Sequence, residues 1–310
     1  MRVKVLGSAA GGGFPQWNCG CANCGALRAG TLKGRPRTQA QLAVSRGAGS
    51  WILLNASPDL RQQILNDPEF SPPEKLRSTP IASVILTSAD LDCVLGLLHL
   101  REFQPLRIYS TPAVRRILCE ENSFFRALER SQPPLTWQDL PRNQTIPIGD
   151  RSAGKEKAPL SCRAIPLGGD FPDYVSEDLR RSLPKEEAVV GLELMQGEKR
   201  LFYAPSLPGA GENWKKSVAS CQVALLDGTF WTDDELSRIL GNGRTSRQIG
   251  HLPLSGDGGL LEQLKNTRGA RRILIHLNNT NPALDEESAA NRALRDASWE
   301  IAYDGMEFEL

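Results

Sequence analysis

Residues 85–97 read ILTSADLDCVLGL, and this stretch decides the fold. The β-branched, apolar residues that lead into it, 81–88, are typical of a buried strand. From residue 89 to 103, leucine and valine recur at roughly helical spacing. A polar cluster therefore lies at a predicted strand-to-helix junction, and its members are Ser88, Asp90 and Asp92.

Strands and helices alternate on both sides of this junction. We predict earlier strands over residues 3–7, 39–46 and 50–57. A helix follows over 57–66, with Ser57 as its N-cap. Beyond the junction, a strand over 106–110 leads into a helix that Thr111 caps.

The second half of the chain is richer in strands. Short apolar runs from 143 to 225 predict several strands, interrupted by a charged surface excursion over 176–185. The last part predicts a helix capped by Ser255, a strand over 271–277, a helix over 283–297 and a final strand over 299–310. Two strand-rich halves with helices favour a four-layer αββα sandwich in a single domain, 1–310. Periodicity alone does not separate this from a three-layer α/β fold.

Composition excludes several classes of protein. The 310 residues include 37 Lys and Arg against 36 Asp and Glu, so the chain has no overall positive field for a nucleic acid. No apolar run approaches the ~20 residues of a membrane span, and the first residues lack the pattern of a secretory signal. We therefore expect a cytoplasmic protein with no nucleic-acid or membrane partner. A homodimer remains open.

Three of the seven cysteines form a C-x-C-x-x-C motif, a spacing that favours metal binding over disulfides in a cytosolic chain. Cys19, Cys21 and Cys24 supply three soft thiolate ligands, which suit a tetrahedral structural zinc with a fourth donor from elsewhere. Of the three histidines, His99 lies in the apolar helical stripe, and His251 stands in a loop bounded by glycine and proline. We predict His251 as the fourth ligand. Three reduced thiols are the alternative.

The polar junction occupies the place of the H-x-H-x-D-H motif of metallo-β-lactamase-like proteins. Laid on that motif, Asp92 matches the aspartate, while Ser88, Asp90 and Cys93 stand where histidines are expected. Other motifs occur in a fixed order: GSAAGGGFPQWNCGCANC, SPDLRQQI, ADLDCVLGLLHLRE, GHLPLSG and HLNNTNP. Together they resemble the coenzyme PQQ synthesis protein B family over nearly the whole chain.

This resemblance implies a metallo-β-lactamase fold, a structural zinc on the three cysteines with a histidine partner, and a role in making pyrroloquinoline quinone (PQQ). The cofactor is built from a peptide whose glutamate and tyrosine side chains are cross-linked. The family is similar to an iron-dependent oxygenase that hydroxylates the tyrosine-derived ring of this intermediate. An older view makes it a carrier that helps to export the finished cofactor.

For the active site we expect donors at one sheet edge, where this fold keeps its metal. The candidates for catalysis are Asp90, Asp92, Cys93, Asp227 and His276, and the active-site metal ligands would be Asp90, Asp92, Cys93 and His276. Asp90 as a helix cap, Asp227 in a turn and His276 in the core are the structural alternatives. A thiolate at Cys93 can bind iron, whereas a buried neutral thiol would only fill space.

A substrate with several carboxylates needs cationic and polar partners. We predict Arg101, just beyond the helix, together with Asn279 and its neighbours Asn278 and Thr280. Two other functions remain open. A hydrolase of the same fold would need the full histidine motif, and a non-catalytic carrier of PQQ or its precursor would not.

Overall fold

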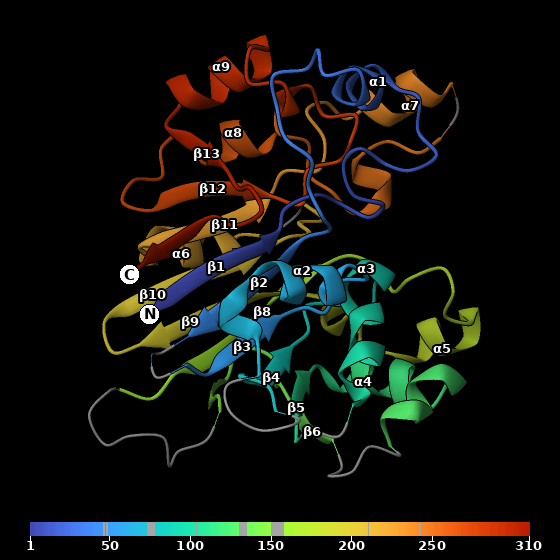
Figure 1. The fold of residues 1–310 in the computed structure, drawn as a ribbon, viewed down its shortest axis with the longest axis vertical. Helices are drawn as coiled ribbons and strands as arrows, with labels where there is room; N and C mark the ends of the chain where they lie inside the picture. Colours follow the sequence, from blue (N-terminus) through green and yellow to red (C-terminus); the bar gives the residue numbers. More distant parts are fainter. Residues whose placement is uncertain are drawn as a thin grey trace.

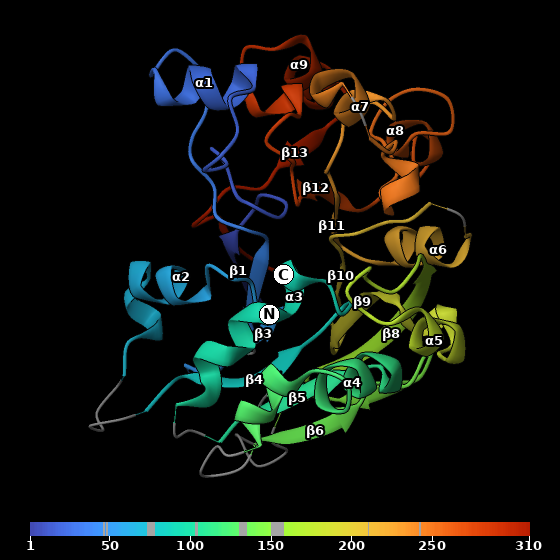
Figure 2. The same cartoon turned by 90° about the vertical axis from the view of Figure 1, so that its right-hand side faces the viewer.

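The computed structural model describes residues 1–45, 47, 49–72, 78–102, 105–129, 135–149, 158–209, 211–241 and 243–310. Two seven-stranded sheets organise these residues. Figures 1 and 2 show the sheets packed together, with helices outside them. The end of the helix predicted over 89–103 falls outside the described residues.

The first sheet has the strand order β14-β1-β2-β3-β4-β5-β6. From β14 to β3 neighbouring strands are antiparallel, and from β3 to β6 they are parallel. Its strands are β14 (Glu307–Glu309), β1 (Arg2–Gly7), β2 (Gln41–Ser45), β3 (Trp51–Leu54), β4 (Ile81–Ile85), β5 (Arg107–Ser110) and β6 (Thr136–Asp139).

The second sheet repeats this arrangement in the order β13-β12-β11-β10-β9-β8-β7. Pairs from β7 to β10 are antiparallel and pairs from β10 to β13 are parallel. Its strands are β13 (Trp299–Ile301), β12 (Arg271–Ile275), β11 (Val223–Asp227), β10 (Lys199–Ala204), β9 (Val189–Gln196), β8 (Ser161–Gly168) and β7 (Thr145–Pro147).

Alternation along the strands creates two hydrophobic cores. Side chains such as Val5, Leu54, Leu192 and Leu225 point between the sheets, and one buried cluster unites them. The opposite faces are covered by helices, with α2 and α4 against the first sheet and α6 and α9 against the second. The predicted four-layer αββα sandwich is therefore confirmed.

The helices are short. They are α1 (Ala22–Arg28), α2 (Leu60–Asn66), α3 (Leu91–Val94), α4 (Pro112–Cys119), α5 (Glu177–Ser182), α6 (Asn213–Ser220), α7 (Glu235–Leu240), α8 (Leu260–Gln263) and α9 (Ala289–Asp296). Short 3₁₀ helices lie at η1 (Pro68–Phe70), η2 (Leu95–Arg101), η3 (Ser123–Leu128), η4 (Lys185–Glu187), η5 (Arg247–Ile249) and η6 (Pro282–Leu284). Within the described ranges, no helix combines the length and apolar character that a membrane crossing requires.

Several local predictions are corrected. Ser57 does not cap α2, because its hydroxyl donates to Gln63 and the N-cap position belongs to Asp59. Ser255 does not cap α8, because its hydroxyl donates to the carbonyl of Trp231. The predicted final strand divides into β13 and β14, which belong to different sheets. The Thr111 cap of α4 is confirmed, since its hydroxyl accepts the backbone N–H of Val114.

Candidate metal centre

Three metal-binding side chains converge at one end of the second sheet. Asp227 is the last residue of β11, and His276 directly follows β12. Because these parallel strands are neighbours, their carboxyl ends bring both residues to the same edge. His251 joins them from the loop after η5, and one ligand atom of each residue lies within 4.8 Å of the others.

Hydrogen bonds fix the orientation of both imidazole rings. His251 Nδ1 lies 2.7 Å from Asp227 Oδ2. The hydroxyl oxygen of Thr229 lies 2.8 Å from His276 Nδ1 and 3.1 Å from His251 Nδ1. Asp227 is fully buried and also accepts the backbone N–H of Leu207 at 2.8 Å. The rings stack with centroids 5.3 Å apart, so the centre is held rigidly before anything binds.

The backbone at His276 is strained. Its φ of +63° lies in the left-handed region, which costs a non-glycine residue roughly 1–2 kcal/mol. Thr229 holds the conformation by donating its hydroxyl to the carbonyl of His276 at 3.0 Å. Strain of this kind persists where the surroundings determine the geometry, as they do at functional sites.

The polar junction of Ser88, Asp90 and Asp92 reaches the centre from the first sheet. Asp92, in the short helix α3, places Oδ2 2.8 Å from His276 Nε2. Asp90 holds the N-cap position of this helix but makes no side-chain cap hydrogen bond, and its Oδ2 accepts the hydroxyl of Ser88 at 2.7 Å. The structure thus brings Asp92, Asp227 and His276 together, with Asp90 beside them.

Cys93 stands apart from the converging donors. Its sulfur lies 3.8 Å from the hydroxyl of Thr87, and the residue is buried. Burial, reinforced by the charges of Asp92 and Asp90, raises the pKa of this thiol well above its usual value. Among the described residues, the group of convergent donors contains His251 and not Cys93. Of the predicted active-site ligands, His276 belongs to this described group, whereas Asp90, Asp92 and Cys93 do not.

Charge in the centre is balanced between carboxylates and imidazoles. Burial opposes ionisation of Asp227, but the charge of His251 and its hydrogen bond outweigh it and lower the pKa of the carboxyl. Burial similarly disfavours a charged His276, yet the hydrogen bond and charge of Asp92 raise its pKa. For Asp90, burial and the charge of Asp92 act together and raise the pKa.

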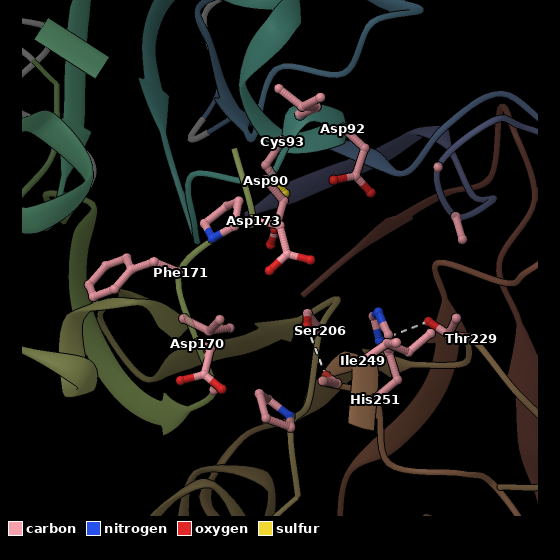
Figure 3. A pocket seen from close by; sticks show the side chains of 18 of the residues that line it. Asp90, Asp92, Cys93, Asp170, Phe171, Asp173, Ser206, Thr229, Ile249 and His251 are labelled. Carbon is pink, nitrogen blue, oxygen red and sulfur yellow. Dashed lines mark hydrogen bonds between the residues drawn. The ribbon is translucent and has the colours of Figure 1, made fainter. Parts of the chain in front are cut away.

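A cavity of about 1410 Å³ opens onto this centre. Figure 3 shows Asp90, Asp92 and His251 around the same hollow. The walls include α5 with the loop before it, and the loop around His251. The lining cations are Arg180, Arg181, Lys185, Arg244 and Arg247.

The predicted substrate contact at Arg101 is corrected. Among the described residues that line the cavity Arg101 is absent; its guanidinium donates to the carbonyl of Leu98 and pairs with Glu102 at 3.4 Å. It lies on the outer turn of η2, because the helical stripe directs its apolar members inward. The described cations of the cavity come instead from α5, from η4 and from the segment that leads through η5 to His251.

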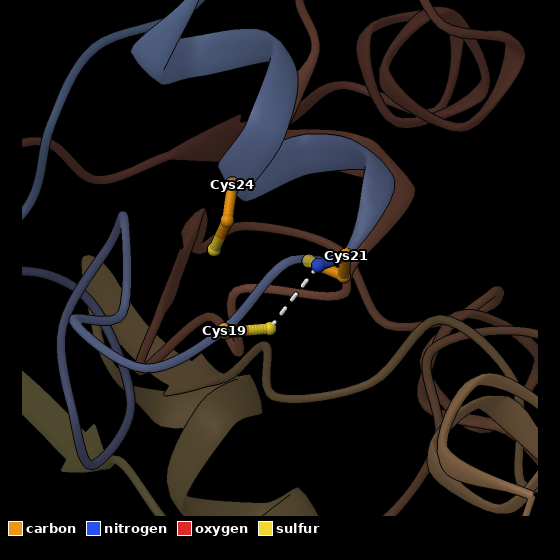
Figure 4. Close-up of side chains that lie close together, drawn as sticks. All are labelled: Cys19, Cys21 and Cys24. Carbon is orange, nitrogen blue, oxygen red and sulfur yellow. Dashed lines mark hydrogen bonds between the residues drawn. The ribbon is translucent and has the colours of Figure 1, made fainter.

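The three motif cysteines form a second donor group. Their sulfur atoms lie within 4.8 Å of one another, and Figure 4 shows them converging from the loop and the start of α1. The side-chain amide of Asn279 lies 3.1 Å from the sulfur of Cys19 and 3.4 Å from those of Cys21 and Cys24. The oxygen and nitrogen of a side-chain amide are assigned from such contacts. A half-turn of the Asn279 amide therefore directs its oxygen, which can ligate a metal ion, toward the three sulfur atoms.

Two predicted roles exchange places here. His251 does not complete the cysteine group, because it is hydrogen-bonded to Asp227 and stacked on His276. Asn279 does not line the described walls of the cavity; it contacts the cysteines, while its neighbour Asn278 lines the cavity. One signal in the sequence could have indicated His251. The chain has three histidines, so an active-site metal with more than one imidazole ligand had few candidates besides His276.

Comparison with known proteins places this architecture in a family. The β-lactamase superfamily domain matches residues 50–277. Coenzyme PQQ synthesis protein B of Azoarcus sp. (strain BH72) is 42% identical over 314 residues, which cover 100% of both chains. The chain belongs to the coenzyme PQQ synthesis protein B family. The family member from Methylorubrum extorquens is 37% identical over 311 residues, which cover 100% of both chains.

Solved structures agree with this assignment to the coenzyme PQQ synthesis protein B family. Zn(2+)-bound PqqB from Methylobacterium extorquens matches with a TM-score of 0.90 at 37% identity, covering 100% of each chain. A diphosphatase of the PhnP family matches with a TM-score of 0.66 at 16% identity, covering 100% of this chain and 97% of that one. The latter likeness shows the fold alone. The chain is a PQQ biosynthesis protein with the metallo-β-lactamase fold.

Proposed function

We propose that this protein hydroxylates the tyrosine-derived ring of the cross-linked glutamate–tyrosine precursor of PQQ. The observation that carries the proposal is the convergence of His251, His276 and Asp227 within 4.8 Å. Two imidazoles and one carboxylate are the donor composition of non-haem Fe(II) oxygenases.

The donor chemistry of the chain fits two different metals. Nitrogen and oxygen donors suit iron, and Asp92 adds a second carboxylate beside His276. The sulfur atoms of Cys19, Cys21 and Cys24 suit a structural zinc, with the Asn279 amide as the adjoining oxygen donor. A zinc-bound relative with the same fold supports zinc as a metal of this chain. Bound at the histidine centre, ferrous iron would supply the activation of dioxygen.

The residues around the centre hold and orient its two imidazole rings. Asp227 and Thr229 fix the two rings, so neither imidazole has to reorganise during the reaction. The cavity, of about 1410 Å³, can accept the cross-linked glutamate–tyrosine precursor and place its ring beside the centre. In the overall step a ring C–H becomes C–OH; one oxygen atom of O₂ enters the product and the other becomes water. Two electrons come from a small reductant of the ascorbate or thiol class, with two protons from solvent.

Anaerobic purification followed by elemental analysis and single turnover tests the proposal. We expect zinc and iron together, and a mass gain of one oxygen atom from ¹⁸O₂ in the cross-linked substrate. Iron-loaded protein that binds the substrate and leaves its mass unchanged under oxygen with ascorbate as the reductant would contradict the hydroxylase assignment.

A carrier of PQQ or its precursor is the second candidate, and one observation favours it. Ser88 and Cys93 stand where the superfamily motif has histidines, and the Cys93 thiol is buried with a raised pKa. A carrier would bind the finished cofactor and retain it without turnover. Equilibrium dialysis with PQQ, beside the oxygen experiment, separates the two functions.

A further inference from the structure

Two arginines on different walls of the cavity share one carboxylate. Arg180, from α5, lies 3.1 Å from Oδ1 of Asp173, and Arg244, from the loop before η5, lies 3.2 Å from Oδ2 of the same residue. All three residues line the cavity. Two guanidinium groups therefore face a single negative charge.

We propose that Arg180 and Arg244 form a carboxylate clamp for the ligand, and that Asp173 occupies it in the ligand-free protein. The inference rests on the proposed function, because it names how the multi-carboxylate precursor is held. A ligand carboxylate displaces the Asp173 side chain and takes its place between the guanidinium groups.

Geometry supports the exchange of one carboxylate for another. Arginine presents its donors in a fixed fork that matches a carboxylate. Asp173 now takes one hydrogen bond from each arginine, at 3.1 Å from Arg180 and 3.2 Å from Arg244, so each guanidinium already holds one carboxylate oxygen. The Nε of Arg180 is buried and makes no hydrogen bond to any described residue, so the clamp retains a donor for an additional acceptor. Asp173 makes no other ion pair in the described part of the chain.

The exposure of Asp173 and Arg244 keeps the free-energy cost of displacing the Asp173 carboxylate small. The side chain of Asp173 is 71% exposed and that of Arg244 is 62% exposed, so solvent screens their ion pair. The Arg180 side chain is less exposed, at 31%, so it is the more firmly placed arginine of the clamp. A ligand that also contacts the rest of the cavity gains more binding free energy than the solvated Asp173 ion pair contributes.

A tether connects the clamp to the metal centre. The hydroxyl of Tyr174 donates to the carbonyl of Ala89, next to Asp90. The loop that carries Asp173 is therefore fixed against the polar junction. A carboxylate held by the arginines leaves the remainder of the ligand directed along the cavity, where Asp90 and the histidine centre lie.

Binding measurements on the full-length, metal-loaded protein test the clamp without turnover. Titration calorimetry under anaerobic conditions would use the cross-linked glutamate–tyrosine precursor, PQQ and the methyl esters of both. We expect Arg180→Gln and Arg244→Gln each to weaken binding of the free acids roughly tenfold or more. Both substitutions should also reduce the preference of the protein for free acids over esters.

The decisive variant is Asp173→Asn, which removes the internal competitor and should tighten binding severalfold. If the ion pairs only support the loop, Asp173→Asn and Arg180→Gln will instead weaken binding alike, and the clamp is refuted. Arg181→Gln is the matched control, because Arg181 lies on the same helix but pairs with Glu177. An equal loss in this control would indicate a general positive field and overturn the proposal. Thermal melting of each variant excludes misfolding.

The clamp and the hydroxylase proposal fail in different experiments. Unchanged affinities in both arginine variants, or wild-type protein that binds neither acid, refute the clamp. Arginine-dependent binding without incorporation of ¹⁸O₂ keeps the clamp and refutes the hydroxylase.

Discussion

At the scale of single residues, hydrogen-bond partners distinguish the convergent donors from the side chains beside them. His251 and His276 share Thr229 as a hydrogen-bond partner, whereas Cys93 contacts Thr87. The hydrogen bond to Thr229 therefore distinguishes the two candidate histidine ligands from the neighbouring Cys93.

We expect His276→Ala and His251→Ala to lower iron affinity by more than about tenfold, because each removes a nitrogen donor from the convergent group. Cys93→Ser should leave iron content unchanged within about twofold. Elemental analysis after anaerobic loading measures both, with zinc content as the internal control. Loss of iron in Cys93→Ser to the level of His276→Ala would return the thiolate to the ligand set.

Asn279 provides a second residue-scale prediction. Its amide touches all three sulfur atoms, so Asn279→Ala should weaken zinc retention roughly 10–100-fold against a competing chelator. Asn279→His should restore much of it, because an imidazole is a good fourth ligand for zinc. His251→Ala must leave zinc retention unaffected; a zinc loss there would reinstate His251 at the cysteine site.

At the scale of elements, close backbone contacts shape the junction beyond what periodicity suggests. A helix is predicted across 89–103, yet α3 ends at Val94 and continues as the 3₁₀ helix η2. Gly96 lies directly against the loop after β3, where its N–H donates to the carbonyl of Ala56 at 2.8 Å. A built Cβ at Gly96 would lie 2.2 Å from the carbonyl oxygen of Ser57.

Gly96→Ala should therefore destabilise the protein by about 1–3 kcal/mol or more, since backbone atoms cannot yield as side chains do. Urea unfolding followed by circular dichroism measures the change. Gly25→Ala is the matched control, because a Cβ there meets nothing within 4 Å and Gly25 lies within α1. The control should be neutral or stabilising by up to about 1 kcal/mol. An equal loss in both variants would contradict the steric explanation.

At the scale of the whole molecule, the cysteine group connects the two ends of the sequence. The amide of Asn23 donates to the carbonyls of Asn279 and Asn281 at 3.1 and 2.9 Å. The two termini also meet, since β1 pairs with β14 and the N–H of Leu310 donates to the carbonyl of Met1 at 2.9 Å. Figure 1 shows both ends on the same side.

Removal of zinc should loosen this long-range connection while the sheets persist. We expect chelation to lower the melting temperature by several degrees and to speed proteolysis within residues 11–35, because metal binding contributes to folding free energy. The triple variant Cys19→Ser, Cys21→Ser, Cys24→Ser should behave like the chelated protein and no longer respond to chelator. A response that persists in this variant would assign the effect to the histidine centre.

The sequence alone predicted the alternation of strands and helices, the strand-to-helix junction and the cysteine motif, because hydrophobic period and close spacing are local properties. The four-layer arrangement rested on the motifs that carry the family resemblance, since periodicity does not separate it from a three-layer fold. It also placed Asp92 at the strand-to-helix junction and predicted that Asp227 and His276 meet it at one sheet edge. Only the tertiary structure decided which donors meet: His251 joined Asp227, Asn279 reached the sulfurs, and Arg180 and Arg244 shared Asp173. Apart from Asp173 and Arg180, which are 7 residues apart, these partners are separated by 24 residues or more. Their proximity depends on the packing of the fold, because packing brings loops from distant parts of the chain to one edge.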